Sequence, residues 1–123
     1  MEQDAAILLL DDYPDSCEAV ASWLEIEGWL VIPTTSADAA LDALRRKPVV
    51  AVVMEPYLRA GEAMHVAEAA RDAVFGRPLV VSMSARGRQG DPVSYEPTLF
   101  DFNLVKPVAL EKLGQILSPL RGR

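Results

Sequence analysis

The chain has 123 residues, half of them hydrophobic, and a net charge of −6. This length supports a single domain with a full apolar core and is too short for two, so we interpret residues 1–123 as one domain. The acidic balance disfavours direct binding of nucleic acid. No apolar stretch is long enough to span a membrane, and no signal peptide is recognisable. The single cysteine, Cys17, is interpreted as a core residue, and its being alone fits a reducing, cytoplasmic compartment.

Two continuous apolar runs, Ala5–Leu10 and Val49–Met54, have the pattern of strands that are covered on both faces of a sheet. A half-exposed strand would alternate polar and apolar residues, and neither run does so. Further strands are predicted at Trp29–Pro33, Leu79–Met83 and Leu104–Val105. These buried runs favour a parallel sheet with helices on both of its faces.

Helical segments separate the predicted strands. An acid three residues after Asp15 gives the spacing of a capping box, which predicts that a helix begins there and ends at Gly28. Ser36 is expected to cap a second helix. Two more helices are predicted, one over Glu62–Val74 with its last residue on the buried face, and one from about Leu110. The alternation of strands and helices predicts a three-layer α/β sandwich of the doubly wound type.

Polar side chains follow four of the predicted strands, and they are Asp11, Asp12, Glu55, Ser84 and Lys106. Because neighbouring parallel strands lie about 4.8 Å apart, we expect these side chains to converge at one edge of the sheet. Three carboxylates so close together would repel one another unless a cation lies among them. Lys106 supplies one positive charge, and Mg²⁺ held by Asp11, Asp12 and Glu55 would supply the rest. The Ser84 hydroxyl is suited to hydrogen-bonding a bound oxyanion.

This ordered set of sequence pieces resembles the receiver domain of two-component response regulators. The matching pieces are the apolar run that ends in Asp11 and Asp12, the valine-rich run that ends in Glu55, the segment PLVVSMSA with Ser84, and the segment LVKPV with Lys106. The resemblance spans nearly the whole chain. It implies a five-stranded parallel sheet of the flavodoxin-like, CheY-like fold, with the strand order 2-1-3-4-5.

The resemblance also implies a phosphoryl switch. In this family an aspartate after the third strand takes a phosphoryl group from a kinase histidine. By resemblance, Asp11, Asp12 and Glu55 would hold Mg²⁺, and Ser84 and Lys106 would bind the phosphoryl oxygens. The implied partner is a protein such as a histidine kinase, a phosphotransfer protein or an output domain, and a homodimer is compatible with the family.

Two positions depart from the family's pattern. Glu55 stands where the family has the phosphoacceptor aspartate, and its extra methylene extends the side chain by about 1.5 Å. Because a misplacement of about 1 Å can cost about 10²-fold in rate, Glu55 is expected to be a poor acceptor and to imitate the phosphorylated state instead. Asn103 stands three residues before Lys106, where the family has an aromatic relay residue. Together these changes favour a pseudo-receiver that is not an enzyme and that signals by protein–protein interaction without normal phosphorylation.

Three other interpretations stay open. One is a Mg²⁺-dependent switch in which Glu55 or another acid is weakly phosphorylated. Another is a small Mg²⁺-dependent phosphatase with Asp11 or Asp12 as its nucleophile, which is disfavoured because neighbouring side chains of an extended chain diverge. The third is a flavin-binding flavodoxin-like domain, whose phosphate loop Tyr13–Asp15 does not resemble. The sequence contains no second histidine, and no cysteine lies near His65. We therefore interpret His65 as a surface residue rather than a metal ligand.

The segment Arg86–Pro97 is predicted to lack the regular helix that the family has there. Gly87 and Gly90 each lower helix propensity by about 1 kcal/mol relative to alanine, and Pro92 fits only in a first helical turn. At most a single turn remains. Hydrogen exchange of the isolated chain tests this prediction, and slow, helix-patterned amides from residue 88 to residue 98 would contradict it.

Overall fold

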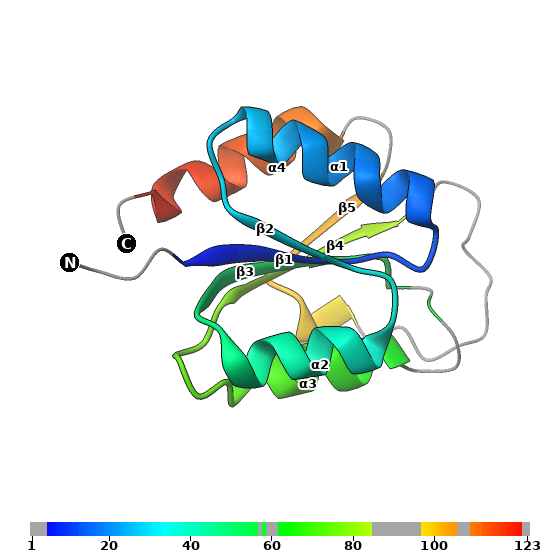
Figure 1. Cartoon of the computed structure of the whole chain (residues 1–123), viewed down its shortest axis with the longest axis vertical. Coiled ribbons are helices and arrows are strands. Elements are labelled where there is room, and N and C mark those ends of the chain that lie inside the picture. The colour runs from blue at the N-terminus through cyan, green and yellow to red at the C-terminus, as the bar shows by residue number, and fades with distance from the viewer. Residues whose placement is uncertain (1–4, 57, 59–61, 85–96, 106–108, 122–123) are drawn as a thin grey trace.

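The computed structural model describes residues 5–56, 58, 62–84, 97–105 and 109–121 of the chain. Within these ranges, strands and helices alternate around one five-stranded parallel sheet (Figure 1). The strands are β1 (Ala6–Leu10), β2 (Val31–Thr34), β3 (Val49–Met54), β4 (Leu79–Ser84) and β5 (Phe102–Val105). The α-helices are α1 (Pro14–Ile26), α2 (Ala37–Arg46), α3 (Glu62–Arg71) and α4 (Ala109–Leu117), and the short 3-10 helices are η2 (Pro97–Leu99) and η3 (Ser118–Leu120).

The strand order in the sheet is β2-β1-β3-β4-β5, and every neighbouring pair is parallel. The predicted fold class and strand order are therefore confirmed. Because all the strands run the same way, their carboxyl ends lie at one edge of the sheet, on the right in Figure 1. No helix in the described ranges is long and apolar enough to cross a membrane.

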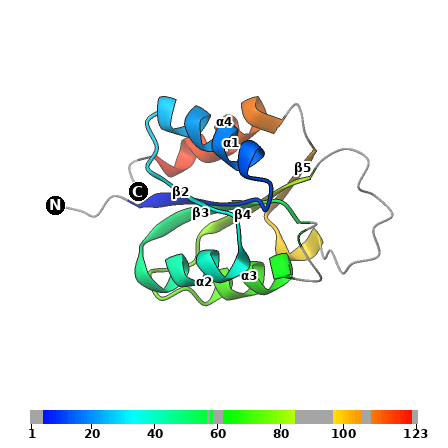
Figure 2. The same cartoon turned by 45° about the vertical axis from the view of Figure 1, so that its right-hand side comes forward.

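Helices cover both faces of the sheet, with α1 and α4 on one face and α2 and α3 on the other (Figures 1 and 2). Alternate residues of the central strands therefore enter two separate apolar clusters. In β1, Leu8 and Leu10 belong to the cluster with α2 and α3, whereas Ile7 and Leu9 belong to the cluster with α1 and α4. This two-sided burial is the physical reason for the continuous apolar runs in the sequence.

Helix α1 starts differently from the prediction, and helix α2 starts as predicted. Helix α1 begins at Pro14 with Tyr13 as its N-cap, and no side chain caps it, so the predicted capping box at Asp15 is wrong. A proline in the first turn needs no partner for a backbone N–H, and the charge of Asp15 in that turn still suits the helix dipole. In α2, the Ser36 Oγ accepts a hydrogen bond from the Ala39 N–H at 3.1 Å, which confirms the predicted cap.

Helix α3 is shorter than predicted and ends at Arg71. Val74 consequently lies beyond the helix and is 74% exposed, so its predicted place on the buried face is wrong. The buried face of α3 consists of Ala63, Val66, Ala67 and Ala70. The helical spacing in the sequence extended this face to Val74 because it assumed a longer helix.

Strand β5 begins at Phe102, two residues before the predicted start at Leu104. It is an edge strand, and its Phe102 and Val105 side chains are 44% and 45% exposed. The segment Arg86–Pro97, for which we predict no regular helix, lies outside the described residues except for its last residue, which begins η2. That prediction stays a prediction.

Gly114 lies in α4 where this helix packs against α1. A Cβ atom at this position would lie 3.1 Å from Cη2 of Trp23, which is closer than ordinary van der Waals contact. Glycine within a helix costs about 1 kcal/mol relative to alanine. The structure gives a reason for accepting that cost, because a Cβ atom here would require the Trp23 ring to shift by a few tenths of an ångström.

We predict that the effect of Gly114→Ala depends on Trp23. In the wild-type background, the gain of about 1 kcal/mol in helix propensity is offset by displacement of the ring, whereas a Trp23→Ala background recovers the gain in full. Urea unfolding of the four proteins in a double-mutant cycle measures this coupling. If Gly114→Ala changes the free energy of unfolding equally in both backgrounds, the close approach of the two helices does not explain the glycine.

Candidate functional site

The backbone pairing of β1 with its neighbours β3 and β2 continues one residue past the ends of β3 and β1. The Glu55 N–H donates to the Leu10 carbonyl at 2.9 Å, and the Asp11 N–H donates to the Thr34 carbonyl at 3.1 Å. Leu10 pairs with Met54, so Asp11 and Glu55 follow a paired rung and occupy adjacent positions at the strand ends. By strand alternation, both side chains lie on the face of the sheet that α1 and α4 cover.

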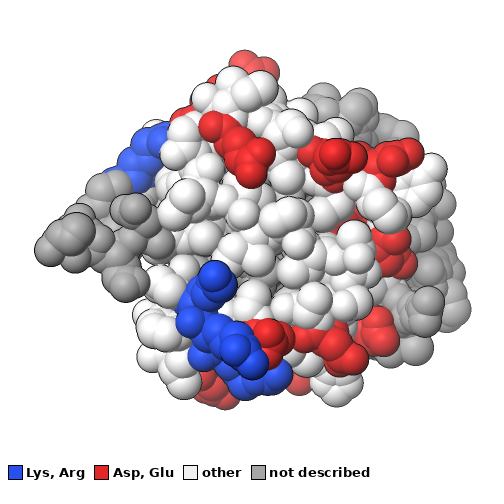
Figure 3. Space-filling view, in the orientation of Figure 1, with Lys and Arg blue, Asp and Glu red and all other residues white. Residues whose placement is uncertain are grey.

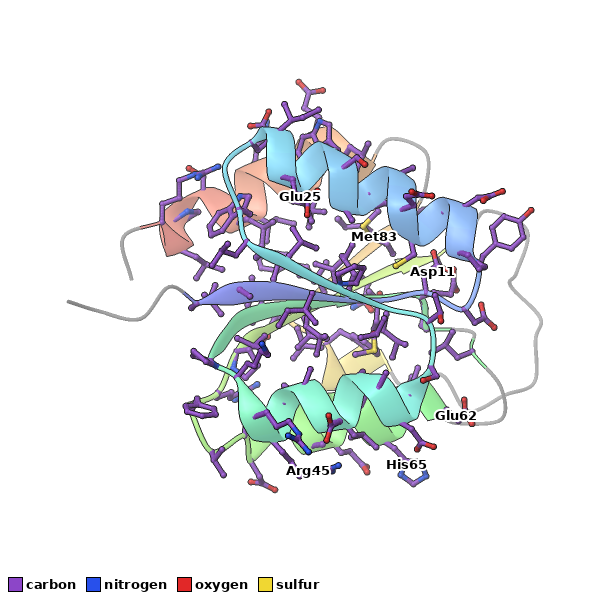
Figure 4. The ribbon with its side chains drawn as sticks, viewed as in Figure 1. Asp11, Glu25, Arg45, Glu62, His65 and Met83 are labelled. Carbon is purple, nitrogen blue, oxygen red and sulfur yellow. The ribbon has the colours of Figure 1, made fainter. Side chains whose placement is uncertain are left out.

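Asp11 and Glu55 line one small pocket beneath α1. The rest of the lining is apolar or contains sulfur, and consists of Leu9, Leu10, Cys17, Val20, Val53, Met54 and Met83. Figure 4 shows Asp11 and Met83 at the same end of the sheet, below α1. Two carboxylates beside an apolar wall favour a bound cation, because poor solvation strengthens their repulsion.

Glu55 is the only charged residue that is buried in the described ranges, with 5% of its surface exposed. Burying a carboxylate is costly unless it is hydrogen-bonded or paired. No buried side-chain nitrogen or oxygen in these ranges lacks a hydrogen-bond partner. The end of β3 therefore holds the Glu55 carboxylate inside the protein, and Glu55 is not a solvated loop acid.

Asp11 also shapes the turn that leads from β1 into α1. Its Oδ1 accepts a hydrogen bond from the Tyr13 N–H at 3.0 Å. This contact between residues two apart is the usual way in which an aspartate closes a turn. Asp11 is half-buried, so its carboxylate both lines the pocket and sets the direction in which α1 begins.

Asp12 lies on the other side of the sheet edge. It is exposed and lines a separate cleft together with Thr35, Ser36, Ala37, Asp38, Leu58 and Glu62. Adjacent side chains of an extended chain point in opposite directions, which explains why Asp11 and Asp12 diverge. The structure thus brings Asp11 and Glu55 together without Asp12. Across the described ranges, no three or more His, Cys, Asp or Glu residues are grouped so that they could hold a metal ion.

Ser84 ends β4 and is half-buried. It is not among the residues that line the pocket with Glu55. Met54 of β3 pairs with Ser82, so the β4 residue level with Glu55 is Met83, and Met83 does line the pocket. Ser84 lies one residue farther along the strand, toward the open end of the sheet edge.

Lys106 lies outside the described residues. Val105, which precedes it in the chain, ends β5 and pairs with Ser84. That Ser84 and Lys106 bind one oxyanion therefore stays a prediction. His65 is exposed on α3, as expected, and points away from the sheet in Figure 4.

Two residues of the pocket, Cys17 and Met83, were not among the predicted site residues. The Cys17 thiol donates to the Thr34 carbonyl with a sulfur–oxygen distance of 3.6 Å, and its side chain is buried as predicted. Strand register alone would have placed Met83 beside Glu55. The sequence carries no comparable signal for Cys17, because its contact depends on how α1 lies over the sheet.

Acidic side chains border the edge of the sheet where the strands end, on the right in Figure 3. A basic group lies elsewhere, over the last turn of α2, which contains Arg45 and Arg46. Clustered charges of one sign raise the local concentration of oppositely charged ions. Among the described residues, the charges near the pocket therefore favour cations over anions.

Comparison with known proteins identifies the fold. No family model and no curated protein matches the chain. The receiver domain of a sensor histidine kinase from Pseudomonas aeruginosa PAO1, with a magnesium ion coordinated in its active-site cleft, superposes with a TM-score of 0.80 at 22% identity, covering 98% of this chain and 100% of that one. A CheY-like receiver domain from Methanospirillum hungatei JF-1 gives 0.78 at 18% identity, covering 96% and 94%. Another from Methylobacillus flagellatus gives 0.76 at 24% identity, covering 97% and 100%.

The chain therefore has the fold of response regulator receiver domains, as its sequence predicts. The match extends over nearly the full length of both partners in each comparison. At these identities the likeness establishes the fold, and the chemistry of the site must be argued from the residues of this chain.

We predict that Mg²⁺ binds weakly at Asp11 and Glu55, because one or two carboxylates with bound waters suffice for this ion. A titration followed by backbone amide shifts should move the ends of β1 and β3 first. Asp11→Asn or Glu55→Gln should abolish these shifts, whereas Asp12→Asn, on the other side of the edge, should weaken binding only slightly. An effect of Asp12→Asn as large as that of Asp11→Asn would mean that all three acids share the ion, and the absence of shifts at millimolar Mg²⁺ would contradict the site.

Proposed function

We propose that the chain is an atypical receiver module of phosphorelay, or two-component, signal transduction. It acts by binding a protein partner, without normal phosphorylation at the end of β3. The observation that carries this proposal is the buried Glu55 carboxylate beside Asp11 in a receiver-type fold. This is the strand end where the family has its phosphoacceptor aspartate.

The length of Glu55 makes it a poor phosphoryl acceptor. Phosphoryl transfer depends on positioning and charge neutralisation, with the attacking oxygen in line with the leaving group. The glutamate side chain is about 1.5 Å longer than an aspartate side chain, and a misplacement of about 1 Å can cost about 10²-fold in rate. Glu55 is held in a pocket walled by Val53 and Met83, so it has little freedom to retract. It instead places a carboxyl group permanently near the position where a phosphoryl group would be attached.

Asp11 and Glu55 are the residues that would hold Mg²⁺ at this site. A bound Mg²⁺ would neutralise their charges and offer coordination positions to an incoming anion. The presence of magnesium in the cleft of the Pseudomonas receiver domain supports this assignment. Lys106 is proposed to add a second positive charge and Ser84 a hydroxyl donor.

The proposed partner is a protein of a phosphorelay, such as a histidine kinase, a phosphotransfer protein or an output domain. The acidic surface near the strand ends disfavours nucleic acid as a direct ligand. A buried, single cysteine suits the reducing cytoplasm, which we propose as the location. Enzymatic activity as a phosphatase is disfavoured because Asp11 and Asp12 line different pockets and cannot act on one substrate together.

A second candidate function is a weakly phosphorylated, Mg²⁺-dependent switch. The observation in its favour is that two carboxylates, from Asp11 and Glu55, still share a pocket at the strand ends. When no cation is bound, the repulsion between two neighbouring carboxylates destabilises the fold. A pair of carboxylates kept at that cost favours a continuing role for a bound cation.

Intact mass after incubation with acetyl phosphate and Mg²⁺ separates the two candidates. We expect no phosphoryl adduct on the wild-type chain, and partial labelling of Glu55→Asp, whose shorter side chain restores the acceptor geometry. Glu55→Gln serves as the control that cannot be labelled at this position. A wild-type adduct that disappears in Glu55→Gln would overturn the phosphorylation-independent function and establish the switch.

A further inference from the structure

Strand β5 has little apolar packing to fix its alignment with β4. Phe102 and Val105 are 44% and 45% exposed, Asn103 is exposed, and Leu104 is half-buried. Strands whose two faces differ little in burial specify their register weakly and tend to slip. Phe100 is buried, but it anchors the chain before the strand begins. The burial of apolar side chains therefore does little to fix the register of β5, which depends largely on other contacts.

Polar side chains supply those contacts at two successive positions on one face of the strand pair. The Ser82 hydroxyl donates to Oδ1 of Asn103, its partner in register, at 2.8 Å. Two residues earlier along each chain segment, the backbone N–H of Val80 in β4 donates to Oδ2 of Asp101, which directly precedes β5, at 2.8 Å. The Asp101 N–H in turn donates to the Val80 carbonyl at 2.7 Å, and the Arg77 guanidinium lies 3.6 Å from the same carboxylate.

These contacts discriminate strongly between registers. Ser82 is 1% exposed, and losing a hydrogen bond from a buried hydroxyl is costly. A slip of β5 by one residue would place Phe102 or Leu104 opposite Ser82, where neither side chain can accept a hydrogen bond. A slip by two in one direction would bring Asp101 to Ser82 and take it away from Val80. Each alternative therefore loses at least one of these two part-buried hydrogen bonds.

Asparagine is otherwise a poor choice for this strand. It is depleted in β-strands, where β-branched and aromatic residues are favoured. The hydrogen bond from Ser82 is what asparagine offers here and what an apolar residue cannot. The low β propensity of asparagine thus disfavours it at position 103, and the hydrogen bond from Ser82 outweighs this disadvantage.

We propose that Ser82, Asn103 and Asp101 are positioning residues that lock β5 in a single register. The lock sets where the carboxyl end of β5 reaches the edge of the sheet. In this register Val105 pairs with Ser84, and the chain then continues directly into Lys106. The consequence for the site rests on the proposed function, because it assigns a role to Lys106. The lock itself does not depend on that function.

Nuclear magnetic resonance of the whole chain tests the lock through cross-strand contacts and amide exchange in β5. Asn103→Leu removes the acceptor while improving apolar character and β propensity, and Asn103→Asp keeps an acceptor oxygen. We expect Asn103→Leu to speed exchange of the β5 amides about tenfold and to give a second set of β4–β5 contacts. Asn103→Asp should stay within about twofold of wild type. Amides of β1 and β3 should be unchanged in both variants.

The opposite partner gives an independent comparison. Ser82→Ala should loosen β5 as Asn103→Leu does, and Ser82→Thr should preserve the register because it keeps the hydroxyl. Ser22→Ala, at an exposed position of α1, is the matched control and should have no effect on β5. If Asn103→Leu does not fold, the comparison of Ser82→Ala with Ser82→Thr tests the lock by itself.

Two results would overturn the lock. One is a single register with wild-type protection in both Asn103→Leu and Ser82→Ala. The other is equal loosening by Asn103→Leu and Asn103→Asp, which would assign the effect to side-chain shape instead of the hydrogen bond. No metal, phosphodonor or partner enters these measurements, so failure of the lock is distinguishable from failure of the proposed function.

Discussion

Burial of both faces of β1 and β3 is the constraint on which the rest of the structure depends. Ile7 and Leu8 are completely buried although they point to opposite faces, and so are Ala51 and Val52 of β3. Apart from the half-buried Val50, every side chain within these two strands is buried, so polar groups are displaced to the first positions beyond them. Parallel pairing then brings those positions together at one edge. The site is a consequence of how the core is covered.

Continuous apolar runs made the strands, their parallel arrangement and the alternation with helices predictable. Helix ends were less predictable because they depend on single contacts. Asp15 has the spacing of a cap, but Pro14 already starts α1 and needs no cap for its missing N–H. Val74 matches a helical spacing, but the helix stops at Arg71 and the residue faces solvent. Local sequence patterns indicate which element a segment can form, whereas the contacts at each end determine where that element begins and stops.

The residue types of the site were also readable from the sequence, whereas their grouping required the register. Asp11 and Asp12 look equivalent in the sequence, yet the alternation of an extended chain sends them to different pockets. Met83, and not Ser84, is level with Glu55 because Met54 pairs with Ser82. Such distinctions depend on single-residue offsets between strands, which no pattern within one strand contains. The Ser82–Asn103 contact has the same origin, since it joins positions far apart in the chain.

We propose that Glu55 occupies the receiver's acceptor position as a fixed, buried carboxyl group that does not form a phosphoryl bond. The decisive measurement is a crystal structure of the chain with Mg²⁺ and beryllium fluoride, which mimics a phosphoryl group on carboxylates. We expect Mg²⁺ between Asp11 and Glu55 and no beryllium fluoride attached to Glu55. Beryllium fluoride bonded to a carboxylate oxygen of Glu55 would show that the proposal is wrong.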